Sequence, residues 1–246
     1  MDNLVSIQWL DETESTQDVL RSGIPSYDNL SVVAARLQTA GRGQRGNRWL
    51  SGKGENLTFS ILLKFGNRGG FPSLPVSGQF SISEAISCGI CDYLASKGID
   101  SRIKWPNDIY VRNRKICGML IENSLEGSDI SSSVVGIGLN VNQKVFPPQL
   151  VNPTSRSLLT GKEYVLEEEL TILTGFLFPG GRLPDRRDDY LSRLYRIGEY
   201  HEYADCSDGS VFEGKITGVT REGLLQVENR KGELKEFAFK EINYII

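Results

Sequence analysis

A glycine- and arginine-rich segment, residues 41–49 (GRGQRGNRW), carries the residue types best suited to chemistry in this sequence. Its three glycines permit backbone conformations that other residues resist, and they let the backbone approach a ligand closely. Its three arginines are permanently charged donors suited to phosphate, and Trp49 adds an aromatic face. The segment therefore predicts a loop that folds over a nucleotide; a solvated basic loop is the alternative.

The same segment contains the pattern G-x-G-x-x-G, which can mark a dinucleotide-binding turn. That motif needs a strand before it and a helix that starts inside it. Residues 30–38 read as a strand, but residues 56–64 (NLTFSILLK) read as a second strand, and no helix pattern lies between them. This strand–loop–strand setting excludes the dinucleotide-binding interpretation.

A second polar group, residues 104–108 (KWPND), lies between two short predicted strands. Pro106 restricts the backbone before it to extended conformations and favours a turn. Lys104 would then stand at a strand end, where it could meet an anionic ligand. An ordinary surface turn with a stray lysine is the alternative.

Glycines also interrupt two predicted strands further along the chain, at Gly118, Gly136 and Gly138. Glycine weakens a strand and often marks the close approach of a ligand. Asn140 ends the second of these strands, and its amide could read an adenine edge through paired hydrogen bonds. Each signal is weak alone, but their order and spacing together are specific.

The elements that must position these residues follow from the hydrophobic pattern. Residues 5–23 read as a strand, a polar turn and a short helix, with Ser15 or Thr16 as its cap. A long helix is expected over residues 76–97, a hairpin over residues 108–122 and helices within residues 153–195. From residue 199 to the end, short strands alternate with glycine-containing turns, which predicts a small, SH3-like β-barrel.

Composition narrows the class of protein. The 246 residues carry a net charge of −3, which disfavours a general nucleic-acid binder that uses the arginine-rich segment. No apolar run reaches membrane-spanning length and no signal-peptide pattern is present, so we expect a cytoplasmic protein without a membrane partner. Cys88 and Cys91 lie in the predicted long helix, and His201 is the single histidine, so we predict no metal site and no histidine-based hydrolase.

Taken together, these segments resemble those of bacterial biotin–protein ligases, which attach biotin to lysines of carrier proteins such as that of acetyl-CoA carboxylase. The resemblance covers nearly the whole chain. It implies an α+β protein with a mixed β-sheet and helices on one face, like the class II synthetases, over residues 1–198. A C-terminal small SH3-like β-barrel would follow over residues 199–246. The segments that carry it are residues 14–17, Gln38, residues 41–49, 104–108, 115–122 and 136–142, and the C-terminal β segment.

The resemblance also implies site residues. Lys104 and Arg42 are the expected catalytic residues. Biotin would be bound by Ser15, Thr16, Gln17, Gln38, Gly41, Arg42, Gly43, Gln44, Trp49, Lys104, Gly118 and Gly138. ATP would be bound by Arg42, Arg45, Arg48, Trp49, Asn107 and Asn140.

Two features depart from the family pattern. The commonest loop has arginine where Gln44 stands and often a basic residue where Asn47 stands. The ESTQ segment begins at Glu14, so we expect no helix-turn-helix domain and no DNA as a partner. Family members often dimerise by pairing sheet edges, and residues 131–142 are a candidate for that edge.

The implied reaction has two steps and no covalent enzyme intermediate. The biotin carboxylate attacks the α-phosphorus of ATP, giving biotinyl-5′-AMP and pyrophosphate, and a lysine of a biotin carboxyl carrier protein then displaces AMP. ATP and biotin are substrates, and Mg²⁺ is expected to arrive with ATP. The alternatives are a lipoate–protein ligase, whose usual loop is absent here, and a non-catalytic biotin-binding module.

Overall fold

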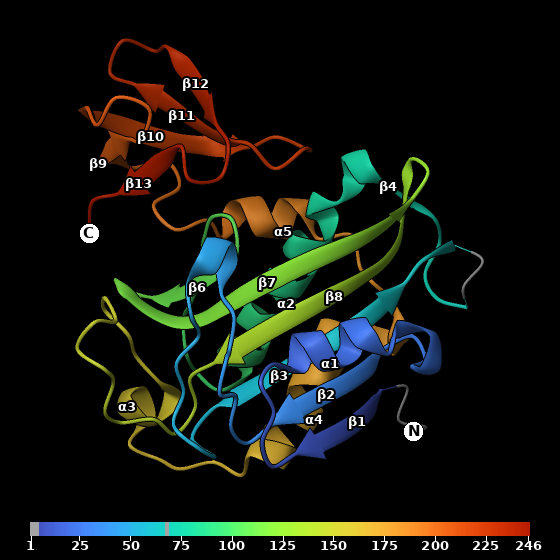
Figure 1. The fold of residues 1–246 in the computed structure, drawn as a ribbon. Helices are drawn as coiled ribbons and strands as arrows, with labels where there is room; N and C mark the ends of the chain where they lie inside the picture. Colours follow the sequence, from blue (N-terminus) through green and yellow to red (C-terminus); the bar gives the residue numbers. More distant parts are fainter. Residues whose placement is uncertain (1–4, 67–68) are drawn as a thin grey trace.

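The computed structural model describes residues 5–66 and 69–246, and the side chain of Arg45 lies outside this description. Two β-sheets organise the chain (Figure 1). The first contains β1 (Ser6–Leu10), β2 (Ser31–Ala35), β3 (Leu57–Lys64), β4 (Leu74–Pro75), β5 (Arg102–Lys104), β6 (Asp108–Val111), β7 (Arg114–Glu126) and β8 (Asp129–Leu139). The helices are α1 (Thr16–Ser22), α2 (Phe80–Ser96), α3 (Arg156–Thr160), α4 (Leu166–Leu177) and α5 (Arg187–Ser192).

The first sheet has the strand order β1-β2-β3-β8-β7-β6-β5, with β4 paired to β8. β1 and β2 are parallel, whereas the other neighbouring pairs are antiparallel, so the mixed sheet expected from the sequence is confirmed. The strands at 57–64 and 108–111 and the long helix also lie where the sequence predicts them. No helix in the described residues is long and apolar enough to cross a membrane.

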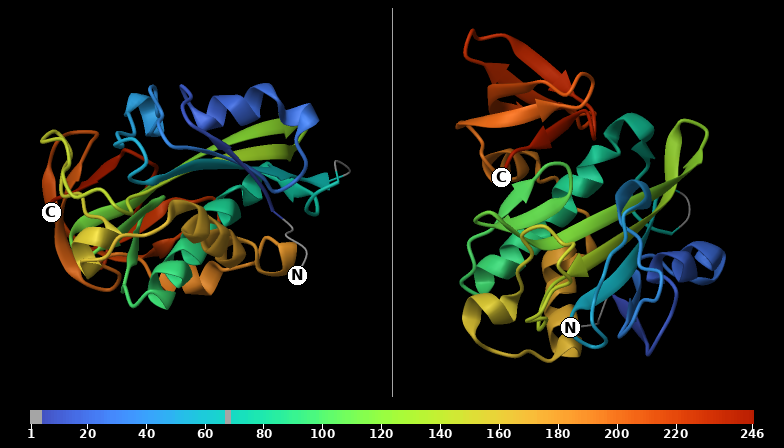
Figure 2. Two further views of the ribbon diagram at one scale, coloured as in Figure 1. Left: turned by 90° about the horizontal axis from the view of Figure 1, so that it is seen from below. Right: turned by 60° about the vertical axis from the view of Figure 1, so that its left-hand side comes forward.

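Helices cover both faces of this sheet, so the expectation of helices on one face is wrong (Figure 2). Phe59 and Ile61 of β3 belong to the large core beneath α2 and α4. Leu62, which points to the other face, packs with Leu20 of α1 and with Val33 in a second cluster. The reason is topological, because the parallel neighbours β1 and β2 need a crossover that leaves the plane of the sheet, and α1 provides it.

The long β8 strand lies inside the sheet. Its residues 132–139 pair with β3 on one side and with β7 on the other. A strand with both edges paired has no free backbone donors to offer a second copy of the chain. The expectation that residues 131–142 form a dimerisation edge is therefore wrong, because the edge strands are β1 and β5.

The second sheet contains β9 (Tyr200–Asp205), β10 (Val211–Val219), β11 (Leu225–Asn229), β12 (Leu234–Phe237) and β13 (Ile242–Tyr244). Its order is β12-β11-β10-β9-β13, and the end strands β12 and β13 do not pair with each other in the described residues. The separate C-terminal β unit is present, but the closed barrel expected from the sequence is not seen. This C-terminal unit contacts the first sheet through Trp105, whose Nε1 donates to the Gly223 carbonyl at 2.9 Å.

Candidate functional site

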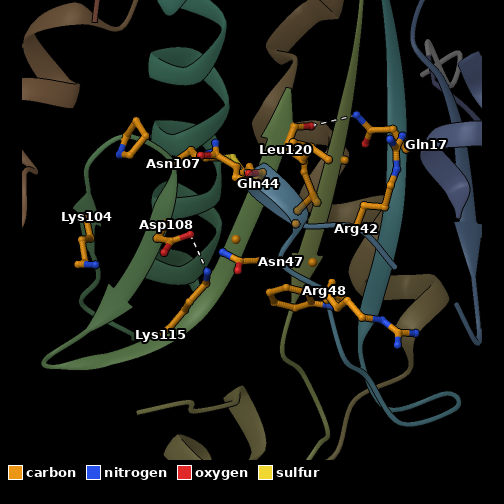
Figure 3. A pocket seen from close by; sticks show the side chains of 18 of the residues that line it. Gln17, Arg42, Gln44, Asn47, Arg48, Lys104, Asn107, Asp108, Lys115 and Leu120 are labelled. Carbon is orange, nitrogen blue, oxygen red and sulfur yellow. Dashed lines mark hydrogen bonds and ion pairs between the residues drawn. The ribbon is translucent and has the colours of Figure 1, made fainter. Parts of the chain in front are cut away.

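A cavity of about 330 Å³ lies where the glycine-arginine loop, the first sheet and the C-terminal unit meet (Figure 3). The loop crosses its mouth, β7 and β8 form its floor, and the turn at residues 104–108 forms one wall. Most of the site residues predicted from the sequence line this cavity, although they come from distant parts of the chain. They are Ser15, Thr16, Gln17, Gln38, Arg42, Gly43, Gln44, Arg48, Trp49, Lys104, Asn107, Gly118 and Gly138.

Glycines of β7 and β8 make room for side chains above the sheet. A Cβ added to Gly138 would lie 2.1 Å from Cε2 of Trp49, and one added to Gly136 would lie 2.1 Å from Oε1 of Gln17. Gly118 faces both Trp49 and the ammonium group of Lys115. The indole ring therefore rests directly on strand backbone, and the same slot would admit a flat ligand if the ring moved aside.

Polar side chains from the start of α1 form the second wall. The backbone N and Oγ1 of Thr16 lie 2.8 and 3.0 Å from Gln38 Oε1, and Thr16 Oγ1 lies 2.8 Å from Ser60 Oγ. Ser15 stands at the N-cap position but makes no capping hydrogen bond with its side chain, contrary to one of the two caps considered from the sequence. These groups suit a small polar heterocycle that both donates and accepts hydrogen bonds.

Glu122 of β7 links this wall to the loop. Its carboxylate accepts from Nε2 of Gln17 at 3.0 Å and from Nη2 of Arg42 at 3.0 Å. Arg21 reaches the same carboxylate at 3.3 Å, and Asp18 pairs with Arg42 at 2.7 Å. Two carboxylates, one from α1 and one from β7, therefore hold the guanidinium group of the loop.

Some buried polar atoms of the loop have no hydrogen-bond partner among the described residues. Its backbone closes through the hydrogen bonds Trp49 N to Gly41 O and Gly43 N to Asn47 O, around the short turn η2 (Gln44–Gly46). Arg42 Nε, Gln44 Oε1 and Trp49 Nε1 are buried and have no hydrogen-bond partner among the described residues. Buried polar atoms of this kind favour partners that a ligand supplies.

Two lysines face the cavity on the side away from Gln17 and Arg42 (Figure 3). Lys115 Nζ forms an ion pair with Asp108 at 2.7 Å and lies 5.9 Å from the centre of the Trp49 ring. Lys104 Nζ instead lies over the rings of Tyr110 and Tyr244. Burial lowers the pKa of Lys104, against the opposing effect of Asp108.

Positively charged side chains dominate the described lining of the cavity. Its described lining includes one carboxylate, Asp108, and the basic residues Arg42, Arg48, Lys104, Lys115 and Lys240. Such a concentration of cations suits a ligand with several negative charges, such as a nucleotide triphosphate. In the described residues no group of three or more histidine, cysteine, aspartate or glutamate side chains could hold a metal ion.

Some predicted site residues do not line the cavity. Gly41 lies at the base of the loop, where its carbonyl accepts from Trp49 N. Asn140 is buried, and its Nδ2 donates to the Thr154 carbonyl at 2.9 Å. Asn107 does line the cavity, but its amide donates to the Met119 carbonyl. The predicted role of Arg45 falls on a side chain outside the described residues.

Other lining residues were not among the predicted ones. Lys115 and Asp108 are the most important of these. Both lie in segments that the sequence already marks, so the lysine three residues before Gly118 could have been predicted as a site residue. Lys240 and Tyr244 reach the cavity from the C-terminal unit. No local pattern marked them, because their role depends on how the two sheets dock.

Comparisons with known proteins find relatives in both sequence and structure. The sequence profile of the biotin/lipoate A/B protein ligase family matches residues 9–140. A biotin–[acetyl-CoA-carboxylase] ligase of Paracoccus denitrificans is 30% identical over 203 residues, which cover 77% of this chain and 81% of that protein. A bifunctional ligase/repressor of Bacillus spizizenii is 28% identical over 223 residues, covering 85% of this chain and 64% of the relative. This chain therefore spans less than two thirds of that relative's length.

Among solved structures, a biotin protein ligase from Aquifex aeolicus in complex with biotin and ATP superposes with a TM-score of 0.74. It is 26% identical, and the match covers 98% of this chain and 99% of that one. A biotin-bound mutant of the Aquifex aeolicus protein gives a TM-score of 0.75 at 25% identity, with 98% and 99% coverage.

Proposed function

This chain belongs to the biotin/lipoate A/B protein ligase family, and on that premise we propose that it is a biotin–protein ligase. It would join biotin and ATP to form biotinyl-5′-AMP and pyrophosphate. It would then transfer the biotinyl group to a lysine of a carboxyl carrier protein and release AMP. The family includes lipoate ligases, but the Paracoccus denitrificans relative and the Aquifex aeolicus structures described above are named for biotin, which disfavours the lipoate alternative.

One observation carries the proposal more than any other, namely the slot above the glycine floor, which the Trp49 ring fills in this structure. It joins the polar wall at Thr16 and Gln17 to the cationic wall at Lys115. Biotin has a polar ring at one end and a carboxylate at the other, so it matches this polarity. The unpartnered polar atoms of the loop, which crosses the cavity, are available to bind the nucleotide.

The chemistry needs alignment and charge neutralisation rather than a protein nucleophile. Bringing the carboxylate and the α-phosphorus together removes much of the entropic barrier, and fixed cations stabilise charge on the phosphate oxygens. We assign the carboxylate of biotin to Lys115, which is next to the slot, and the phosphates to Lys104 and Arg42. Closure of the loop would exclude water, which otherwise hydrolyses the mixed anhydride.

Several finer points belong to the same proposal. The activity would depend on Mg²⁺ carried by the ATP phosphates, because Asp108 is the one carboxylate in the described lining and is paired with Lys115.

Residues 1–198 and 199–246 would be two domains, the second an SH3-like unit. A homodimer, if formed, would use a surface other than β8.

A transfer assay tests the proposal. Radiolabelled biotin, ATP and a biotin carboxyl carrier domain are combined, and each component is omitted in turn. We expect label on the carrier in the complete mixture alone, and loss of biotin-dependent pyrophosphate release in Lys104→Ala. Normal pyrophosphate release by Lys104→Ala would remove Lys104 from the mechanism, and label on the carrier without ATP would exclude the adenylate route.

A further inference from the structure

Lys104 occupies an unusual place for a lysine assigned to phosphate. Its Nζ lies 5.2 Å from the ring centre of Tyr110 on β6 and 4.7 Å from the ring centre of Tyr244 on β13. No described carboxylate lies within ion-pair distance of it, because Asp108, its register partner on β6, pairs with Lys115 instead. Two aromatic faces are therefore the nearest partners of this ammonium group, and one of them comes from the C-terminal unit.

The contact uses the ring of Tyr244 and not its hydroxyl. The Tyr244 hydroxyl is buried and has no hydrogen-bond partner among the described residues. Burial raises the pKa of Tyr244 and of Tyr110 well above the ordinary tyrosine value, so both phenols are neutral where Lys104 is charged. A neutral ring attracts a cation through the negative potential of its face, and the attraction strengthens as water is removed.

Neighbouring rings fix the position of Tyr244. Its ring lies edge-on to Tyr203 of β9, with centroids 5.3 Å apart, and 6.1 Å from Tyr195. Tyr195 in turn lies 5.5 Å from Tyr110. The rings thus form a continuous aromatic cluster that joins the second sheet to β6. The charged groups around Lys104 are Asp108, Lys115 and Arg196.

We propose that Tyr244 is a positioning residue, whose ring face holds the Lys104 ammonium group at the cavity during biotin activation. This inference rests on the proposed function and deepens it. The C-terminal unit then supplies part of the activation machinery, in addition to packing against the first sheet. A lysine on a flexible stem gains a defined position without a carboxylate that would neutralise its charge, so the charge stays available to phosphate.

The test compares variants that keep or remove the ring face. Tyr244→Phe keeps the face and loses only an unpartnered hydroxyl, so it should retain most of the kcat for biotinyl-5′-AMP formation. Tyr244→Leu removes the face, and we expect kcat to fall about tenfold, with a higher KM for ATP and an unchanged KM for biotin. Tyr200→Leu is the matched control, because it removes another aromatic face of the same unit, whose partner is Arg230 at 3.8 Å from the ring centre and which shares no described ring contact with Tyr244. It should lower the Tm and leave kcat unchanged.

A second measurement needs no substrate. Acetylation of Lys104 by acetic anhydride, followed by peptide mass spectrometry, should be faster in Tyr244→Leu than in wild type, Tyr244→Phe and Tyr200→Leu. Wild-type kcat in a folded Tyr244→Leu would overturn the inference alone, as would equal losses in the Phe and Leu variants. A wild-type protein that forms no biotinyl-5′-AMP would overturn the proposed function, and the inference with it.

Discussion

At the scale of single residues, Glu122 connects the ligand wall to the loop, since its carboxylate accepts from both Gln17 and Arg42. Glu122→Gln keeps the shape but removes the charge that strengthens these hydrogen bonds. We expect a loss of biotin affinity of about tenfold, or about 1.4 kcal/mol, measured by calorimetry. Asp18→Asn is the control, because Asp18 is exposed and, among the described residues, pairs with Arg42 alone, so its effect should stay below about 1 kcal/mol. An equal effect of both substitutions would contradict the role of Glu122 in placing Gln17.

The pH dependence of activation also belongs to this scale. Burial lowers the pKa of Lys104, and its charged form is the one assigned to phosphate. The charge is therefore lost as pH rises through a pKa below the ordinary lysine value, and activity should fall there. We expect kcat/KM for ATP to show this alkaline limb, and Lys104→Arg to move it to higher pH because arginine stays charged. The same limb in Lys104→Arg would assign the titration to another group.

The sequence predicted which residues gather at the site better than it predicted what each one contacts. Trp49 and Gly138 were both singled out, but only the fold shows the indole ring resting on that glycine. Lys115 was overlooked beside Lys104, since two lysines in neighbouring motifs look alike until their partners are known. Asn140 has a polar side chain at the predicted strand end, yet it is satisfied by Thr154 and does not line the cavity.

At the scale of elements, the loop over residues 41–49 has glutamine at position 44, where the commonest loop of the family has arginine. The Oε1 atom of Gln44 is buried and has no described partner. Gln44→Arg would place a permanent charge beside the phosphates. We expect biotinyl-5′-AMP to dissociate about fivefold more slowly, as followed by stopped-flow tryptophan fluorescence, for a gain of about 1 kcal/mol. Gln44→Lys should give a smaller gain, since lysine lacks the bidentate fork. Faster dissociation from Gln44→Arg would show that Gln44 does not face the nucleotide.

Strand patterns were enough to place the loop between two strands and so to exclude a dinucleotide-binding turn. They were not enough to order the sheet. The burial of β8 on both edges results from long-range pairing with β3 and β7, which short-range alternation does not encode. The position of α1 on the second face likewise follows from the parallel pairing of β1 with β2, which the sequence pattern did not reveal.

At the scale of the whole molecule, the C-terminal unit docks through Gly223, where φ is +95° and an added Cβ would lie 2.6 Å from the Phe80 ring. Gly223→Ala should destabilise the protein by about 2–4 kcal/mol through backbone strain and overpacking, and it should also reduce activation. Gly232→Ala is the control, with φ of +81° but open space around its Cβ, so it should lose about 1–2 kcal/mol and keep activity. Thermal unfolding measures the stability of both variants, and an adenylate assay measures their activity. Equal activity in both variants would show that docking of the C-terminal unit at Gly223 is not needed for activation.

Activation of biotin by ATP in this cavity is the central claim, and one measurement tests it most directly. Purified wild-type protein is incubated with ATP, Mg²⁺ and either biotin or lipoate, and the acyl adenylate and pyrophosphate are quantified by chromatography. We expect biotinyl-5′-AMP and pyrophosphate in equal amounts with biotin, and neither product above background with lipoate. Adenylate from lipoate but not from biotin, or from neither acid, would contradict the account.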